Sequence, residues 1–192
     1  MADDSPKIID FQFEAMSRLR AKVDALGEAH ASLLQVARSR GDSQSRVHTA
    51  VLAALDAGSP EHFVHVITQD WVDILGLDAV AVALETSPEA VRLAPPGLQF
   101  IGPGQLGAWL DGRSTVSVRD VELGLPLFGP AADLIKSQAL IRLPMDERWP
   151  RGLLALGSRT PHAFEKLANV ELLSFLGAVS ARCLNHWLSL RA

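Results

Sequence analysis

Cysteine is nearly absent from this 192-residue sequence, in which Cys183 is the single example. One cysteine excludes an internal disulfide and any metal site built from several thiolates. Long apolar runs are also missing. A membrane-spanning helix needs about 18 consecutive apolar residues, and no stretch approaches that length. The start of the sequence, MADDSPK, is acidic and no apolar run follows it, so we expect no secretory signal. These absences predict a cytoplasmic protein that does not bind membranes.

An excess of basic charge is missing as well. The 18 Lys and Arg residues are outnumbered by 22 Asp and Glu residues, and the formal net charge is −4. A nucleic-acid-binding surface needs clustered Lys and Arg, so we expect no nucleic-acid partner.

Recognisable catalytic and metal-binding patterns are lacking too. His62 and His65 are three residues apart, but no third ligand follows at a suitable spacing, so we predict no metal and no cofactor. The segment LGSRT, residues 156–160, lacks the second glycine of the nucleophile elbow G-x-S-x-G. We therefore predict that the protein is not an enzyme.

A long amphipathic segment begins near residue 13. Its apolar positions, spaced alternately three and four residues apart as in a coiled coil, are Met16, Leu19, Val23, Leu26, Leu33 and Ala37. His30 occupies a further position of this pattern, as a polar residue that sets the register. The pattern continues at residues 47, 51 and 54, so we predict a disordered tail over 1–12 and a long helix over 13–57.

This stripe needs a partner surface, because a single helix cannot bury it. We predict a homodimer whose interface, called the N-terminal seam below, contains Met16, Leu19, Val23, Leu26, His30 and Leu33. The alternative is that the stripe only covers the protein's own folded body.

Residues 58–192 show a mixture of helical and strand patterns. A helix is predicted from Pro60 to Leu75, with Ser59 as its cap and Gly76 as its end. A helix is also predicted from Lys166 to Leu190, with an apolar stripe formed by Leu172, Leu176, Val179, Cys183 and Trp187.

The strand patterns lie between these two helices. In DAVAVALE, residues 78–85, valines and a leucine share one face and alanines the other. Small side chains let a helix lie close to a sheet, so we expect helices against the alanine face. STVSVRD, residues 114–120, is a further strand, and QALIRLP and GLLALGS form an antiparallel pair. APPGLQFIGPGQLG, residues 94–107, is predicted to be a loop that leads into a short helix. The order indicates an α+β fold with an antiparallel sheet flanked by helices.

Three segments resemble one family. SQALIRLP…RGLLALGSRTPHAF, LRAKVDALGEAHASLLQVARSRGDSQSRVH and WVDILGLDAVAVALE are similar to segments of the DUF484 family of bacterial proteins, a divergent branch of the GAF domains. The resemblance implies a GAF-like sheet with helices on one side and a helical N-terminal extension. It also implies small-molecule binding between the other side of the sheet and a lid, and dimerisation through the terminal helices.

The sequence departs from several specialised GAF domains. The Asn-Lys-Phe-Asp-Glu signature of those that bind cyclic nucleotides is absent, and Cys183 lies on the last helix, outside the pocket in which a bilin-binding cysteine is expected. GAF-type sulfoxide reductases need several cysteines, and this sequence has one. These departures argue against cyclic-nucleotide, bilin and sulfoxide-reductase chemistry.

Large apolar residues in irregular segments are the candidates for a lid over the sheet. The predicted ligand-binding residues are Phe100, Trp109, Phe128 and Ile135, with Arg142 as an anchor for an anion. We predict a regulatory or sensory module that has no catalytic or DNA-binding domain attached and acts through its own assembly or an unidentified protein partner. Two alternatives are a scaffold whose pocket is filled and inert, and an enzyme with an unrecognised site in the same pocket.

Overall fold

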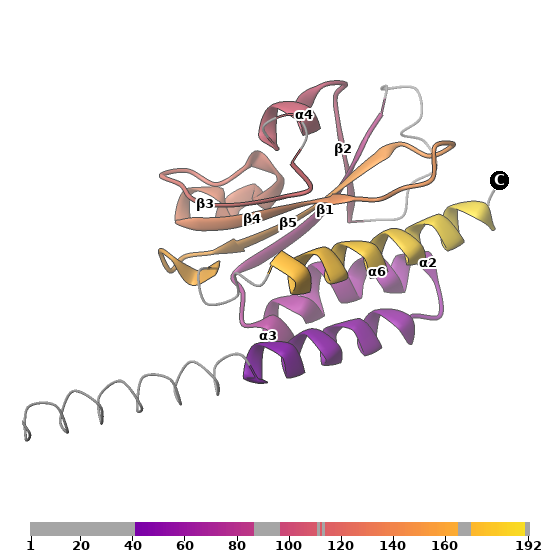
Figure 1. Cartoon of the computed structure of the whole chain (residues 1–192), viewed down its shortest axis with the longest axis horizontal. Coiled ribbons are helices and arrows are strands. Elements are labelled where there is room, and N and C mark those ends of the chain that lie inside the picture. Colours follow the sequence, from indigo (N-terminus) through magenta and orange to yellow (C-terminus); the bar gives the residue numbers. More distant parts are fainter. Residues whose placement is uncertain (1–40, 87–96, 111, 113, 165–169, 191–192) are drawn as a thin grey trace, which may run out of the picture. The chain divides into compact units, whose positions relative to one another are not determined.

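The computed structural model describes residues 41–86, 97–110, 112, 114–164 and 170–190, and the following statements concern these residues. The predicted tail over 1–12, the predicted helix over 13–40 and the whole N-terminal seam lie outside them. Contacts divide the chain into two units, Met1–Gly41 and Asp42–Ala192. The second unit is a five-stranded sheet with long helices on one face and short helical segments on the other (Figure 1). No helix among the described residues is long and apolar enough to cross a membrane.

The helical regions largely follow the sequence prediction. Residues 41–55 are helical, and this segment is called helix 41–55. A second region, predicted from Pro60 to Leu75, contains α2 (Pro60–His65), a π-helical turn η1 (Val66–Asp70) and α3 (Trp71–Leu75). Ser59 Oγ accepts a hydrogen bond from His62 N at 3.1 Å, and Gly76 ends α3 with a φ of 68°, which favours glycine. The last helix, α6, spans Val170–Ser189.

The strands are β1 (Ala79–Glu85), β2 (Leu98–Ile101), β3 (Val116–Asp120), β4 (Ser137–Leu143) and β5 (Arg151–Ser158). Their order in the sheet is β2-β1-β5-β4-β3, and all neighbouring pairs are antiparallel except the parallel pair β1–β2. The prediction of a loop over residues 94–107 was therefore wrong at β2. The predicted α+β class and the predicted strands β1, β3, β4 and β5 are confirmed.

The two faces of the sheet carry different side chains. Val80, Val82 and Leu84 point to the face covered by helix 41–55, α2, α3 and α6, called the helix face. Ala81 and Ala83 point to the opposite face, called the lid face, which the short helix α4 (Gln105–Trp109) and the 3-10 helix η3 (Pro126–Leu134) cover. Helices were predicted on the alanine face, but the structure places only these short ones there.

Helix 41–55 belongs to the body of the protein. Val47, Val51 and Ala54, which continue the heptad pattern, are buried in the helix-face core. Trp71 also fixes this helix, because its Nε1 donates to Ala50 O at 2.8 Å. Residues 42–57 therefore lie in the same compact unit as residues 58–192.

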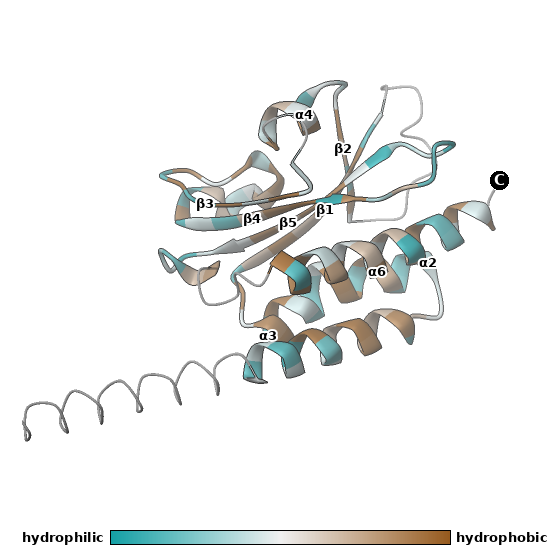
Figure 2. Cartoon of the chain, in the orientation of Figure 1, coloured by the Kyte–Doolittle hydropathy of each residue, from teal (hydrophilic) through white to brown (hydrophobic). Residues whose placement is uncertain are grey.

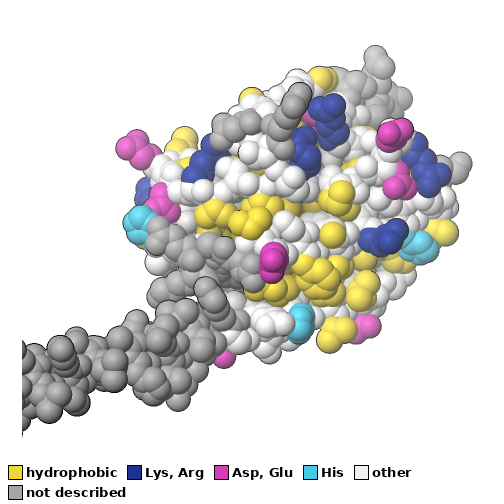
Figure 3. Space-filling view, viewed as in Figure 1, with side chains coloured by type: hydrophobic (Ala, Val, Ile, Leu, Met, Phe, Trp, Pro, Cys, Tyr) yellow, Lys and Arg dark blue, Asp and Glu magenta, His cyan; other side chains and the backbone are white. Residues whose placement is uncertain are grey.

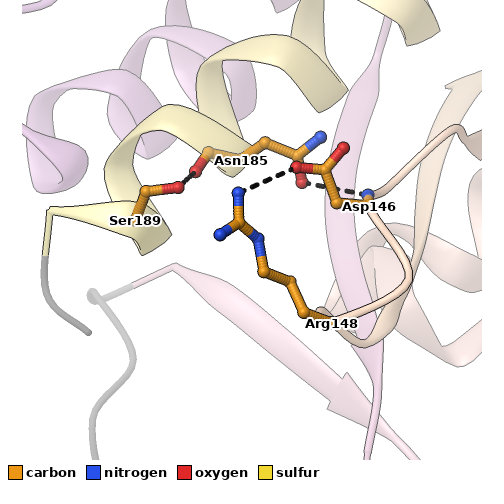
Figure 4. A network of polar contacts seen from close by, with 4 residues as sticks. All are labelled: Asp146, Arg148, Asn185 and Ser189. Atoms are coloured by element: carbon orange, nitrogen blue, oxygen red, sulfur yellow. Dashed lines mark hydrogen bonds and ion pairs between the residues drawn. The ribbon is translucent and has the colours of Figure 1, made fainter.

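The β4–β5 hairpin tip is fixed to the last helix (Figure 4). Asp146 N donates to Asn185 Oδ1 of α6 at 3.3 Å, and Arg148 Nη2 lies 3.4 Å from Asp146 Oδ2. Ser189 Oγ donates to Asn185 O at 2.6 Å. Asp146, Glu147 and Arg148 stay exposed, as predicted, whereas Met145, Trp149 and Pro150 are half-buried.

Candidate functional site

The floor of the candidate site is the lid face, where the central strands carry very small side chains. Ala81 of β1 pairs with Ala155 of β5, Ala83 and Gly157 lie on the same face, and all four are buried. Leu140 and Leu153 are also buried on this face, so small side chains form only one part of the floor, and the lid supplies the volume above that part. Leu106 and other apolar residues from α4, η3 and the adjoining segments fill part of that volume.

One end of this layer is tightly packed. Phe128 and Ile135 are buried above Gly157, and a Cβ atom on Gly157 would lie 2.9 Å from Ile135 Cδ1 and 3.1 Å from Phe128 Cε1. Both distances are shorter than ordinary van der Waals contacts, so the lid touches the sheet backbone at this position.

Polar side chains from the sheet attach the lid to the floor. Glu85, at the end of β1, accepts a hydrogen bond from Leu106 N of α4 through Oε1 at 3.2 Å. Its other oxygen, Oε2, lies 4.0 Å from Arg151 Nη1. Gln99 Nε2, on β2, donates to Leu127 O of η3 at 2.7 Å. Both bonds join a strand side chain to the main chain of a lid helix.

Two arginines hold the connection between α4 and β3. Arg119 Nη2, on β3, donates to Trp109 O at 3.1 Å. Arg142, on β4, donates from Nη2 to Gly112 O at 2.7 Å and from Nε to Ser114 O at 3.5 Å. Glu85, Gln99, Arg119 and Arg142 are together called the lid clamp. Four of the five strands thus contribute one side chain each to hold the lid by its main chain.

An unusual polar group lies beside the clamp. Gln138 is 1% exposed, it lies between Arg119 and Gly157 in the sheet register, and its Oε1 has no hydrogen-bond partner among the described residues. Burying an unpaired amide oxygen costs about 1–3 kcal/mol. The lid face therefore contains an acceptor able to receive a donor from a water molecule or a ligand.

The structure separates the predicted ligand-binding residues. Trp109, Phe128 and Ile135 pack on the lid-face core, but Phe100 packs on the helix-face core, so its predicted place in the lid is corrected. The cause is the strand β2, in which Phe100 pairs with Leu84 and shares its face. Arg142 lies on the lid face as expected, and its guanidinium contacts loop carbonyls.

Sequence reasoning missed three members of the lid clamp: Glu85, Gln99 and Arg119. Glu85 and Arg119 do occupy positions of the strand alternation that face the lid, and this alternation was the available signal. Gln99 gave no such signal, because its strand was not predicted.

Histidines do not form a metal centre in the described part of the chain, where no group of three or more His, Cys, Asp or Glu residues has a suitable geometry. His65 Nε2 lies 3.8 Å from Asp70 Oδ1. His162 adopts a φ of 58°. Its backbone N donates to Asp120 Oδ1 at 3.0 Å, and its ring Nδ1 lies 2.8 Å from Asp120 Oδ2. This pair joins the end of β3 to the segment after β5.

Comparisons with known proteins give similar solved structures and one family. The GAF domain from Acinetobacter phosphoenolpyruvate-protein phosphotransferase has a similar structure, with a TM-score of 0.51 and 14% identity, over 78% of this chain and 96% of that domain. The chromophore-binding domain of an unusual bacteriophytochrome from R. palustris has a TM-score of 0.48 and 12% identity, over 76% of this chain and 62% of that chain. A search of curated protein sequences gives no match. A family model described as "Protein of unknown function, DUF484" matches residues 2–189. The chain therefore belongs to the DUF484 family, and its fold is GAF-like.

Proposed function

We propose that this protein is a cytoplasmic, non-enzymatic regulatory module that binds a small molecule between the lid and the sheet and works as a homodimer. The lid clamp is the observation that carries this proposal. The lid is held both by apolar packing and by these polar attachments. A ligand can take over the polar attachments with its own hydrogen-bonding groups, so its binding would change the position of the lid while the sheet stays intact.

The energies involved suit a switch. A neutral hydrogen bond contributes about 0.5–1.5 kcal/mol net, and one to a charged group about 1.5–3 kcal/mol. Opening the lid at one attachment therefore costs an amount that a small ligand's contacts can offset. A ligand shifts the lid only by the difference between its affinities for the two lid positions.

The chemical character of the lid face favours a ligand with both apolar and hydrogen-bonding groups. The alanine floor offers apolar contact, Gln138 Oε1 offers an acceptor, and the guanidinium groups of Arg119 and Arg142 offer donors. An anionic group would compete with the loop carbonyls for those guanidinium groups.

Native mass spectrometry tests the ligand directly. The purified protein is expected to show a mass above that of the polypeptide, and the excess is expected to disappear on denaturation. Ala83→Val, which narrows the lid face, should lower the occupancy. Ala139→Val is the matched control, because Ala139 is equally buried but faces the helices. Occupancy that falls equally in both variants, or no bound mass in any preparation, contradicts ligand binding on the lid face.

Dimerisation is the second part of the proposal and has its own measurement. Leu19→Lys combined with Leu26→Lys places two charges in the N-terminal seam, so sedimentation is expected to report a monomer. An unchanged mass would show that the seam is not the interface.

A scaffold with an inert interior is the second candidate function. The packing of Phe128 and Ile135 against Gly157 favours it, because that end of the lid face is already filled. This candidate predicts that native mass spectrometry finds no bound molecule and that the Ala83→Val variant dimerises as the wild-type protein does.

A further inference from the structure

The outer surface of the helix layer exposes large apolar side chains. Leu52 and Leu55 of helix 41–55 are 62% and 58% exposed, and Phe175 and Leu190, on and just after α6, are 44% and 65% exposed. The space-filling view shows apolar side chains gathered over these two helices on one face of the molecule (Figure 3). The later part of helix 41–55 is also strongly apolar in the hydropathy view (Figure 2).

The exposed residues follow helical spacing and are not scattered. Leu172, Phe175, Val179 and Cys183 are three or four residues apart on α6, and all except Phe175 are half-buried beside the helix-face core. Five of the eight large hydrophobic residues exposed in the described part of the chain lie on or beside these two helices. Single exposed apolar residues are ordinary, but a continuous strip marks an interaction surface. Leu52, Leu55, Leu172, Phe175, Val179 and Cys183 are called the outer helix surface.

The same sequence contains a segment suited to cover this surface. Residues 13–37 carry the N-terminal seam, whose apolar side chains recur with coiled-coil spacing. As a helix, these residues would extend about 37 Å, long enough to follow the whole of α6, whose 20 residues extend about 30 Å.

Charge also favours this pairing. Residues 13–40 contain five basic and three acidic side chains, whereas residues 41–192 contain 12 basic and 16 acidic ones. The two parts therefore have opposite net charge, and this assists their approach.

The segment that covers the surface is expected to come from another molecule. The heptad pattern continues in register from Met16 to the buried Val47, Val51 and Ala54, and a reversal of the chain between them would break that register. The pattern thus favours a second copy of the chain as the source of the segment. We infer that the outer helix surface binds residues 13–37 of a second copy of the chain, an inference that rests on the proposed homodimer and specifies its contact.

The single cysteine provides a reporter for this contact. Cys183 lies within the outer helix surface, so covering by a second copy should slow its reaction with a maleimide in the full-length protein. The labelling rate is expected to fall with protein concentration in parallel with the fraction of dimer found by sedimentation. Burial of Cys183 within its own chain slows labelling equally at every protein concentration, so it cannot produce this concentration dependence.

Two sets of variants locate the contact. Leu52→Glu with Phe175→Glu changes the surface, and Leu19→Lys with Leu26→Lys changes the seam. Each pair of substitutions alone is expected to give a monomer with concentration-independent labelling of Cys183. Leu123→Glu is the matched control, because Leu123 is 62% exposed like Leu52 but lies outside the surface, and it should leave the dimer intact.

Mixing the two variants gives the decisive result. In a mixed dimer, the lysines of one seam meet the glutamates of the other chain's surface, while the second contact is wild type. The mixture is therefore expected to recover the mass of a dimer. If the seam variant is monomeric but the surface variant still dimerises, and mixing recovers nothing, the seams pair with each other. That outcome overturns the inference and leaves the proposed dimer standing. A wild-type protein that stays monomeric overturns both.

Discussion

The two faces of the sheet are built in opposite ways. On the helix face, large β-branched and leucine side chains of β1, β4 and β5 pack directly on long helices. On the lid face, alanines, a glycine and two leucines lie beneath short helical segments and their connection to β3, which four polar side chains hold through the main chain. Long helices with continuous apolar contact open together, whereas short segments with fewer apolar contacts can open locally. We therefore expect the helix face to be the more stable side of the protein and the lid face to be the side that moves.

Removing one leucine from each face should give the largest difference. Leu153 and Leu154 are neighbours on β5, both are fully buried, and they face the lid and the helices respectively. Leu154→Ala and Leu153→Ala are each expected to lower the free energy of unfolding by about 2–5 kcal/mol. The Leu154→Ala loss should be the larger, because long helices cannot collapse into the cavity as readily as a lid. Urea denaturation measures both values, and an equal or larger loss for Leu153→Ala would contradict the comparison.

Adding a methyl group to a glycine tests how tightly each face is closed. A Cβ atom at Gly177 of α6 would lie 2.5 Å from Ile141 Cγ2, so Gly177→Ala should cost about 1–3 kcal/mol although alanine favours helices. Gly157→Ala instead meets lid side chains, which can shift.

The Gly157→Ala variant should therefore lose less stability, and amide exchange should accelerate in η3 while α6 stays protected. Hydrogen exchange followed by mass spectrometry separates the two responses. Faster exchange of α6 in the Gly157→Ala variant would show that the faces do not move independently.

Breaking one attachment of the lid should have a smaller, local effect. Arg142→Gln removes the guanidinium that binds Gly112 O and Ser114 O, at a cost of about 1 kcal/mol. Amide exchange is expected to accelerate in the α4–β3 connection and not in the helices of the other face. Arg148→Gln at the hairpin tip removes an exposed arginine that does not contact the lid, and it serves as the control. Equal acceleration in both variants would show that the lid clamp does not hold this connection.

The smallest effect concerns the edge of the helix face. Burial raises the pKa of the Cys183 thiol above its ordinary value of 9.0. The folded protein then keeps this proton at a pH where the unfolded chain loses it, so stability should fall as the pH rises above about 9 until the folded thiol also ionises. Cys183→Ala should remove this part of the loss. Identical pH profiles for the two proteins would show that burial does not raise the pKa of Cys183.

The sequence predicted well wherever an apolar pattern was long. The alternation in residues 78–85, the β4–β5 hairpin and the region from Pro60 to Leu75 were all located, because each repeats its period several times. β2 was missed, since four residues between glycines and prolines contain too few repeats to show a period. That one error also placed Phe100 on the wrong side of the sheet.

The last helix shows a finer limit. The predicted stripe was Leu172, Leu176, Val179, Cys183 and Trp187, and only Leu176 of this set is fully buried. The core side instead contains Leu173, Gly177, Ser180 and Leu184. Both stripes satisfy helical spacing, so periodicity alone could not decide which one faces the sheet. The fit of Gly177 against Ile141 decides it, because only a residue without a Cβ atom permits this close approach.

Within the described residues, the sequence by itself determined the main helices, four of the five strands and the α+β class, because these depend on the period of apolar residues along a short stretch of chain. Only the tertiary structure decided which face of the sheet each helix covers, and which polar side chains reach the lid. These features join strands that are distant in the sequence, as Glu85 on β1 and Arg142 on β4 both bind the lid around α4. A hydrogen bond between distant segments depends on how the strands pair, and no local pattern encodes that pairing.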